Sequence, residues 1–280
     1  MRLTEAAPAK LNLALHVRSR RADGYHMLET LFAFVDDGDL LSASPAVDLS
    51  LTIDGPMAAG LAADADNLVM RAAHALGRAA GVDDGAALHL AKNLPVASGI
   101  GGGSADAAAA LRLLNRLWGL HWPLERLAEL AEQLGADVPA CVYARAMLAR
   151  GVGERLEPVN LGDLARAPVL LANPMRAVST GPVFKAWDGV DRGGLGNDIS
   201  LSALREARND LQPGAIGLCP EIEDVIQALE ECPSALLVRM SGSGATCLAL
   251  FADQAGRDAA HLQLRRRHAG WWLLGTALRK

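Results

Sequence analysis

Residues 95–106 read PVASGIGGGSAD, and this stretch decides how the rest of the chain is interpreted. Four of the five positions 99–103 are glycine, which lets the backbone adopt positive φ angles and approach a ligand closely. A flexible turn is the alternative, but a turn needs only one or two glycines, and more of them cost chain entropy unless a ligand orders the loop. A helix is expected directly after the loop, with Ser104 as its N-cap and Asp106 in its first turn. Free N–H groups at a helix start favour a bound anion, so the stretch predicts a phosphate site.

The loop matches neither of the common nucleotide-binding patterns. The P-loop pattern needs a lysine before Ser104, where this chain has Gly103, and the pattern GxGxxG fails because its last position is Ser104. Without a lysine in the loop, the positive charge for phosphoryl transfer has to come from elsewhere. Mg²⁺ and Lys10 are the expected sources.

Upstream of the loop the sequence predicts strands. In residues 10–17, KLNLALHV, every second residue is a large apolar one, so Lys10, Asn12, Ala14 and His16 are expected on the other face of a half-buried strand. The turn signal in residues 20–26, RRADGYH, followed by an apolar run, predicts a hairpin-like connection to a second strand. The other elements expected before the loop are a strand at 47–53, a helix at 67–80 that is stopped by Gly81, and a strand at 86–94.

Two short segments downstream of the loop could carry chemistry. Asp137, in GADVPA, follows a glycine helix stop, and its spacing favours a plain N-cap; the alternative is a base that accepts the proton of an attacking hydroxyl. Residues 240–247, MSGSGATC, form a second glycine loop between two predicted strands. Such a loop alone is more often a tight connection, and only its pairing with the first loop would favour a ligand cleft.

The downstream elements mix helices and strands without regular alternation, which favours an α+β fold over a doubly wound parallel sheet. Two lobes of comparable size are the simplest division, with an N-terminal domain at 1–155 and a C-terminal domain at 156–280. The expected elements are a helix from 104, a helix at 124–134, strands near 142–148 and at 169–173, helices at 181–188, 200–207 and 221–230, strands at 235–240 and 246–251, and a final helix and strand.

The composition describes a globular chain that can bury a large core: 280 residues, 51% hydrophobic and 21% charged. A formal charge of −5 argues against a nucleic-acid partner. The four cysteines have no CxxC pair, which argues against a structural metal. With no signal peptide and no apolar run long enough for a membrane span, we expect a cytoplasmic protein that has no membrane partner and no obligate protein partner.

The motifs together resemble one family, the GHMP kinases, over nearly the whole chain. In order they are APAKLNLALHV, RRADGYH, NLPVASGIGGGSADAA, GADVPA, VSTGPVFKAW, RNDLQPGAIGLCPEI and MSGSGATC. Each motif is modest evidence, whereas the ordered set is specific. The resemblance implies an α+β fold with two lobes: an N-terminal ribosomal-protein-S5-domain-2-like lobe, a C-terminal ferredoxin-like lobe, and an active site in the cleft between them.

The resemblance also implies residue roles at the matching positions. Lys10 and Asp137 would be the catalytic pair, with Asp137 taking the proton of the acceptor hydroxyl and Lys10 orienting that hydroxyl. The cofactor would be ATP with Mg²⁺, with Ser104 near the metal and no firm protein ligand to it. The pair Tyr25-His26 indicates the branch of the family whose small-molecule acceptor carries a cytidine diphosphate group. The implied positions for the ATP phosphates are Pro95, Val96, Ala97, Ser98, Gly99, Ile100, Gly101, Gly102, Gly103, Ser104 and Ala105. The acceptor would be bound by Asn12, Tyr25, His26 and Phe184. Adenine would be contacted by Asn67 and Lys92.

The chain departs from the family pattern in the loop, where Ala97 and Ser98 precede Gly99 and where Ala105 replaces a second serine, so that a hydroxyl is missing beside the phosphates. Two alternatives stay open. One is another small-molecule kinase of the family, such as a mevalonate or homoserine kinase, whose acceptor has no cytosine. The other is a non-catalytic nucleotide-binding protein, against which the presence of both Lys10 and Asp137 speaks.

Overall fold

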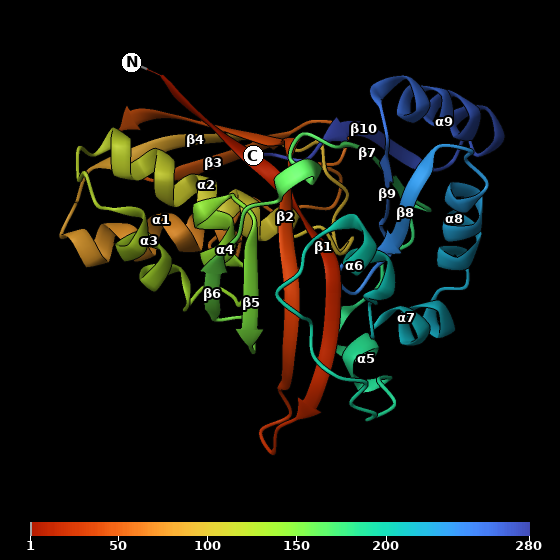
Figure 1. Cartoon of the computed structure of the whole chain (residues 1–280). Helices are drawn as coiled ribbons and strands as arrows, with labels where there is room; N and C mark the ends of the chain where they lie inside the picture. The colour runs from red at the N-terminus through yellow and green to blue at the C-terminus, as the bar shows by residue number, and fades with distance from the viewer. Residues whose placement is uncertain (1) are drawn as a thin grey trace. The chain divides into compact units, whose positions relative to one another are not determined.

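Residues 2–280 are described by a computed structural model, and they form two compact units. The first unit comprises the chain up to Ala9, Asp37–Val96 and Gly101–Ala144; the second comprises Lys10–Asp36, Ala97–Ile100 and Arg145–Lys280. Both units combine helices with strands, which confirms the α+β class (Figure 1). The long strands β1 (Leu3–Arg20) and β2 (His26–Ala46) contribute residues to both units, and the domain boundary expected after residue 155 stays a prediction.

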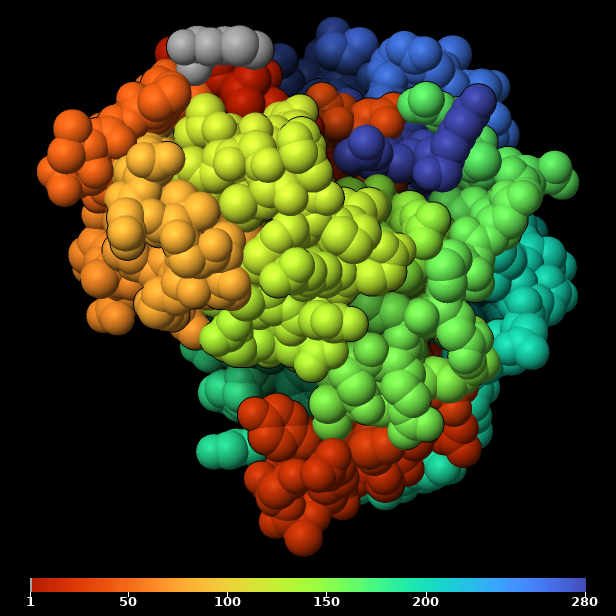
Figure 2. Space-filling model, turned by 90° about the vertical axis from the view of Figure 1, so that its left-hand side faces the viewer, coloured from red at the N-terminus to blue at the C-terminus, as the bar shows by residue number. Residues whose placement is uncertain are grey.

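The first unit combines a small group of strands with four helices. Strand β3 (Ser50–Asp54) pairs in parallel with β4 (Gly85–Ala91), and β4 pairs antiparallel with the last part of β2. The helices are α1 (Leu68–Ala80), α2 (Gly102–Leu117), α3 (Leu124–Ala131) and α4 (Val138–Tyr143), which pack on one another. Figure 1 shows them on one side of these strands, and Figure 2 shows their outer surface, coloured from orange to yellow-green.

Helix α1 shows how local sequence sets an element of this unit. The side chain of Asn67 accepts a hydrogen bond from Val69 N at 3.0 Å and so caps the first turn. Gly81, at a φ of 64°, ends the helix in the left-handed conformation that glycine adopts without a Cβ penalty. Both ends agree with the helix predicted at 67–80.

The second unit contains two groups of strands. The first part of β2 pairs antiparallel with β5 (Met147–Gly151), which pairs with β6 (Arg155–Pro158). A separate four-stranded antiparallel sheet has the order β10-β7-β9-β8. Its strands are β7 (Pro168–Asn173), β8 (Ala235–Met240), β9 (Cys247–Phe251) and β10 (Trp272–Ala277).

The four-stranded sheet has the ferredoxin-like order, in which the first and third of its strands lie at the centre. Helices α8 (Glu221–Glu230) and α9 (Gln254–Arg267) pack on it. In α8, Ile222, Val225 and Leu229 recur at helical spacing and are fully buried in the core of this unit. The ferredoxin-like lobe is therefore confirmed. The remaining helices of the second unit are η1 (Gly162–Leu164), α5 (Thr180–Lys185), α6 (Leu201–Glu206) and α7 (Gln212–Leu218).

The structure differs from these expectations at several elements, among them β4, which ends at Ala91 instead of 94, and α5, which ends at Lys185 instead of 188. The strand expected near 142–148 begins only at Met147, because α4 continues to Tyr143 and Ala144 ends it at a φ of 47°. Helix α3 ends at Ala131 instead of Leu134. Helix α7 was not predicted, since its sequence QPGAIGL contains a proline and two glycines and has no clear apolar period.

Candidate active site

The N-terminus of α2 presents backbone N–H groups in the glycine loop. Gly101 adopts a left-handed φ of 63°, and the helix begins at Gly102. Ala105 N donates to Gly101 O at 2.8 Å, so the N–H groups of Gly102, Gly103 and Ser104 precede the first intrahelical hydrogen bond. Ser104 therefore lies in the first turn, and its prediction as the N-cap is wrong because the glycine starts the helix earlier. Gly103 is exposed and Ser104 half-buried, so this helix end can receive an anion.

A buried ion triad lies directly behind this helix end, within the first unit. Lys92 Nζ contacts both Asp39 and Asp106, the latter at 2.6 Å. A Cβ added to Gly102 would lie 3.1 Å from Lys92 Nζ, which places the ammonium against the helix start. Asp39 also accepts hydrogen bonds from Asn93 N at 2.5 Å and Leu94 N at 2.9 Å. The triad thus ties β2, the end of β4 and α2 together; the expectation that Asp106 lies in the first turn is wrong, because the helix begins at Gly102 and Asp106 is its fifth residue.

The adenine contact implied for Lys92 stays a prediction, whereas the structure gives the side chain a clear structural role in the triad. Burial lowers the pKa of Lys92, but the two carboxylates outweigh this effect and raise it above its ordinary value. Burial raises the pKa of Asp106 to about 7, although Lys92 opposes the shift. Asp106 Oδ1 has no hydrogen-bond partner among the described residues.

We expect the Asp106→Asn variant to reveal this titration. The pKa of Asp106 in the folded protein is about 7, above its ordinary value of 3.8, so the folded state holds a proton that the unfolded chain releases. The contribution of Asp106 to stability is therefore lost as the pH rises through about 7. Relative to the variant, the wild type should lose about 1 kcal/mol of unfolding free energy between about pH 6 and 8. Urea unfolding at both pH values measures this difference, with Asp83→Asn, an exposed carboxylate of the same unit, as the control. Parallel pH dependences of wild type and Asp106→Asn would exclude the titration.

In the second unit, the two glycine loops lie backbone against backbone. Ser98 O accepts from Thr246 N at 3.0 Å, and Gly99 O accepts from Ser241 Oγ at 3.0 Å. Gly99 has a φ of 78°, and a Cβ there would lie 2.4 Å from Ser241 O. The segment Ala97–Ile100 and the loop after β8 are therefore in direct contact, which is the pairing that the sequence required for a ligand site.

The close approach at Gly99 gives a stability prediction. Gly99→Ala should lower the free energy of unfolding by about 2–3 kcal/mol, because the new methyl group meets backbone atoms that cannot move away. Gly189→Ala is the matched control, since Gly189 has a φ of 81° but no atom within 4 Å of its added Cβ. The control should cost only about 1 kcal/mol, from backbone strain. Thermal unfolding of both variants measures the difference, and equal losses would contradict the loop contact.

The polar face of β1 lies beside these loops in the second unit. Lys10 N donates to Ile100 O at 3.0 Å, and Asn12 N donates to Ser241 Oγ at 3.1 Å. Lys10 Nζ donates to Asn12 Oδ1 at 3.0 Å and lies 4.7 Å from the centre of the Phe32 ring. The expected sharing of one strand face by Lys10 and Asn12 is confirmed by this hydrogen bond.

An aromatic cluster also lies in the second unit. The rings of His26 and Phe184 are 5.1 Å apart, and the Trp187 ring lies 5.7 Å from His26 in an edge-to-face arrangement. Burial lowers the pKa of His26, so its imidazole is neutral at physiological pH. Tyr25 is 64% exposed, in the hairpin turn. The structure brings together His26 and Phe184, which are far apart in the sequence. It also adds Trp187, which lies in the motif VSTGPVFKAW but was not predicted as a site residue.

Asp137 and Asn67 belong to the first unit. Asp137 occupies the N-cap position of α4, but its side chain makes no capping hydrogen bond to that helix. The spacing favoured a plain N-cap role for Asp137, but its side chain does not act as a cap. Asn67 caps α1 and donates from Nδ2 to Ala62 O at 2.8 Å, which gives it a structural role, and its adenine contact stays a prediction.

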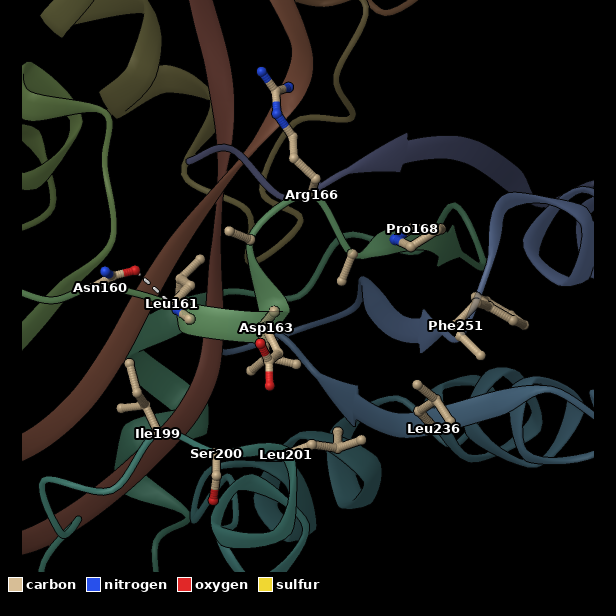
Figure 3. Close-up of a pocket in the computed structure, with 15 residues that line it drawn as sticks. Asn160, Leu161, Asp163, Arg166, Pro168, Ile199, Ser200, Leu201, Leu236 and Phe251 are labelled. Atoms are coloured by element: carbon tan, nitrogen blue, oxygen red, sulfur yellow. Dashed lines mark hydrogen bonds between the residues drawn. The ribbon is translucent and has the colours of Figure 1, made fainter.

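A cavity of about 820 Å³ lies elsewhere in the second unit, around η1 and the start of β7 (Figure 3). Its lining includes the apolar side chains of Leu161, Leu236 and Phe251, and Ser200, which caps α6 through Ala203 N at 3.3 Å. None of the predicted site residues lines this cavity. We therefore do not identify it with the candidate site.

The family model "GHMP kinases N terminal domain" matches residues 67–145, which include the glycine loop and Asp137, and "GHMP kinases C terminal" matches residues 191–270. A protein of Rhizorhabdus wittichii named 4-diphosphocytidyl-2-C-methyl-D-erythritol kinase is 52% identical, with 100% of this chain and 96% of the relative covered. The chain belongs to the GHMP kinase family. A relative of the same name from Sphingopyxis alaskensis is 50% identical over 99% of both chains.

Solved structures agree with membership of the GHMP kinases. A crystal structure of 4-(cytidine 5'-diphospho)-2C-methyl-D-erythritol kinase matches with a TM-score of 0.84 at 35% identity, covering 99% of this chain and 100% of that one. A homoserine kinase from Cytophaga hutchinsonii matches with a TM-score of 0.74 at 19% identity, over 100% of this chain and 96% of that one, which shows the shared fold alone. Among residues 2–280, no helix is both long and apolar enough to cross a lipid bilayer.

Proposed function

We propose that this chain transfers the γ-phosphoryl group of ATP to the 2-hydroxyl of 4-diphosphocytidyl-2-C-methyl-D-erythritol, giving the 2-phosphate and ADP in the non-mevalonate pathway of isoprenoid synthesis. The observation that carries the proposal is the 52% identity, over the full chain, with a relative of that name. Such a relative is far closer than the homoserine kinase, whose 19% identity supports no shared acceptor. GHMP kinases are ATP-dependent phosphotransferases, so ATP is the phosphoryl donor.

The ATP phosphates bind at the glycine loop in this proposal. The N–H groups of Gly102, Gly103 and Ser104 at the start of α2 donate to phosphate oxygens, and the helix dipole favours their negative charge. Ala105 stands where the family has a second serine and carries no hydroxyl, so in this proposal the backbone supplies most of the contacts.

Mg²⁺ fits the residues present at this helix end. The ion takes oxygen ligands, keeps several waters and is usually held through one or two protein oxygens together with substrate phosphates. The half-buried hydroxyl of Ser104 in the first turn of α2 is such an oxygen. When bound, Mg²⁺ neutralises the charge that develops on the phosphoryl oxygens.

Asp137 and Lys10 act on the acceptor. As the 2-hydroxyl oxygen forms its bond to the γ-phosphorus, the O–H bond breaks and the proton passes to the Asp137 carboxylate, while the bond from the γ-phosphorus to the bridging oxygen breaks and releases ADP. Lys10 orients the hydroxyl and stabilises the negative charge on the transferred group. Because the two residues belong to different units, the proposal requires the units to bring them together at the acceptor.

The acceptor is recognised through its cytosine. His26 and Phe184 already lie ring to ring at 5.1 Å, and flat rings of this kind stack on a base. The exposed Tyr25 is free to cover the base from the solvent side. In this proposal Asn12, which accepts a hydrogen bond from Lys10, contacts the acceptor beside the reacting hydroxyl.

A panel of acceptors tests the proposed function. Purified protein with ATP and Mg²⁺ should form ADP with 4-diphosphocytidyl-2-C-methyl-D-erythritol and should not do so with mevalonate or homoserine, which offer no cytosine to His26 and Phe184. Phosphorus NMR of the product should show a new phosphomonoester. ADP formation with mevalonate or homoserine alone would favour another kinase of the family, and ATP binding without turnover on any acceptor would favour a non-catalytic protein. The cytoplasmic location and the independence from nucleic acid, membrane and protein partners remain predictions.

A further inference from the structure

We propose that Thr30 is a positioning residue for phosphoryl transfer: its hydroxyl sets the orientation of the Asn12 side-chain amide and, through it, the place of the Lys10 ammonium. The inference rests on the proposed function, because that function gives Lys10 its role in the reaction. Thr30 belongs to none of the motifs from which the site was predicted. It enters through hydrogen bonds that lie within the second unit.

The hydroxyl of Thr30 has two partners, and they determine what it can offer to each. Thr30 Oγ1 lies 2.6 Å from Ala14 O and 2.7 Å from Asn12 Nδ2. A carbonyl oxygen only accepts, so the single hydroxyl proton is donated to Ala14 O. What remains for Asn12 is a lone pair on Thr30 Oγ1. Thr30 therefore acts as an acceptor toward the amide.

This acceptor leaves the Asn12 amide with one satisfactory orientation. The NH₂ group has to face Thr30, and Oδ1 then faces Lys10 Nζ at 3.0 Å. With the amide reversed, the NH₂ group would face an ammonium, which has only donors, and Oδ1 would face a hydroxyl whose proton is already used. Asn12 is 2% exposed and Thr30 is 1% exposed, so little solvent can compensate for a wrong orientation.

The position of Lys10 depends on this orientation. Its ammonium donates to Asn12 Oδ1 and lies 4.7 Å from the centre of the Phe32 ring, so the amide oxygen is one of the contacts that hold it. Phosphoryl transfer depends on positioning, and a displacement of about 1 Å can cost about 100-fold in rate. Loss of the Thr30 acceptor should therefore lower the rate of phosphoryl transfer, because it displaces the Asn12 amide and with it the Lys10 ammonium.

Three variants separate positioning from packing. Thr30→Val keeps the shape of the side chain and removes the hydroxyl, whereas Thr30→Ser keeps the hydroxyl. Thr276→Val is the matched control, because Thr276 is a buried threonine of the second unit whose hydroxyl has no partner among the described residues. We expect Thr30→Val to lower kcat about tenfold with an unchanged KM for ATP, and Thr30→Ser and Thr276→Val to stay within about twofold of the wild type. A kcat of Thr30→Val within twofold of the wild type would overturn the proposal.

A double-mutant cycle tests whether the effect passes through Asn12. If Thr30 acts by orienting the Asn12 amide, Thr30→Val should cause no further loss of kcat in an Asn12→Ala background. A purely structural role of Thr30 would instead make the two losses multiply, and that outcome would also overturn the proposal.

A structural measurement keeps the positioning role separate from the proposed function. In a crystal structure of Thr30→Val, the hydrogen bond from Lys10 Nζ to Asn12 Oδ1 should be lost or displaced, whereas in Thr30→Ser it should remain. If the wild type forms no ADP with the cytidine-bearing acceptor, the proposed function fails, and these two crystal structures still decide whether Thr30 positions Lys10. An unchanged Lys10–Asn12 hydrogen bond in Thr30→Val would reject the positioning role whatever the activity.

Discussion

Asp137→Asn should lower kcat by at least about 100-fold while leaving the affinity for ATP almost unchanged, because an amide cannot accept the proton of the acceptor hydroxyl. The carboxylate sits at the N-cap position of α4 but makes no capping hydrogen bond to that helix, so the substitution removes no cap. Steady-state ADP formation gives kcat, and calorimetric titration with a non-hydrolysable ATP analogue gives the affinity.

Asp83→Asn is the matched control for this substitution, since Asp83 is an exposed carboxylate of the same unit. The control should retain the full kcat. If Asp137→Asn also retains it, Asp137 is not the base, and its place before α4 is structural only.

Lys10→Met should lower kcat by about 100-fold, the usual scale for removing one group that stabilises charge in the transition state. Methionine is similar in length to lysine but offers no ammonium to Asn12 Oδ1 or to the Phe32 ring, so the variant should fold with a lowered melting temperature. The affinity for the ATP analogue should change little, because the proposed phosphate contacts come from the start of α2. Steady-state kinetics and thermal unfolding of the variant measure these effects.

Lys10→Arg separates charge from position in the same experiment. Arginine keeps a positive charge but cannot place a compact ammonium against Asn12 Oδ1. A partial recovery of kcat relative to Lys10→Met is the expected result. A wild-type kcat for Lys10→Met would remove Lys10 from the reaction.

The sequence was most informative where a local pattern has a single structural solution. The strict alternation of residues 10–17 predicted a strand, and the structure has β1 across all of them; the expectation that it is half-buried is wrong, because both faces are buried there. The first glycine loop was also recognisable, since its four glycines in five positions favour a close backbone approach over a flexible turn. Gly99 shows this directly, because a Cβ there would lie 2.4 Å from Ser241 O.

Features made by distant residues could not be predicted in this way. The triad of Asp39, Lys92 and Asp106 joins three separate segments, and each charge alone resembles a solvated side chain. The only signal was the placement of Asp39 and Lys92 next to strongly apolar runs. The hydrogen bonds that connect Thr30 through Asn12 to Lys10 could not be predicted for the same reason, since a threonine in an apolar strand is ordinarily a packing residue.

The start of α2 shows how a general rule can misplace a boundary. Serine is a common N-cap, so Ser104 was expected to begin the helix. The glycine at 101 adopts a left-handed conformation instead and starts the helix at Gly102. The error matters for function, because it moves two further N–H groups, those of Gly102 and Gly103, into the proposed phosphate site.

A crystal structure with a non-hydrolysable ATP analogue, Mg²⁺ and 4-diphosphocytidyl-2-C-methyl-D-erythritol tests the central claim most directly. We predict that the 2-hydroxyl lies within hydrogen-bond reach, about 2.6–3.2 Å, of the Asp137 carboxylate, with Lys10 Nζ beside it and the γ-phosphate at the N–H groups that begin α2. A 2-hydroxyl that faces away from both side chains, or a γ-phosphate bound elsewhere, would contradict the account.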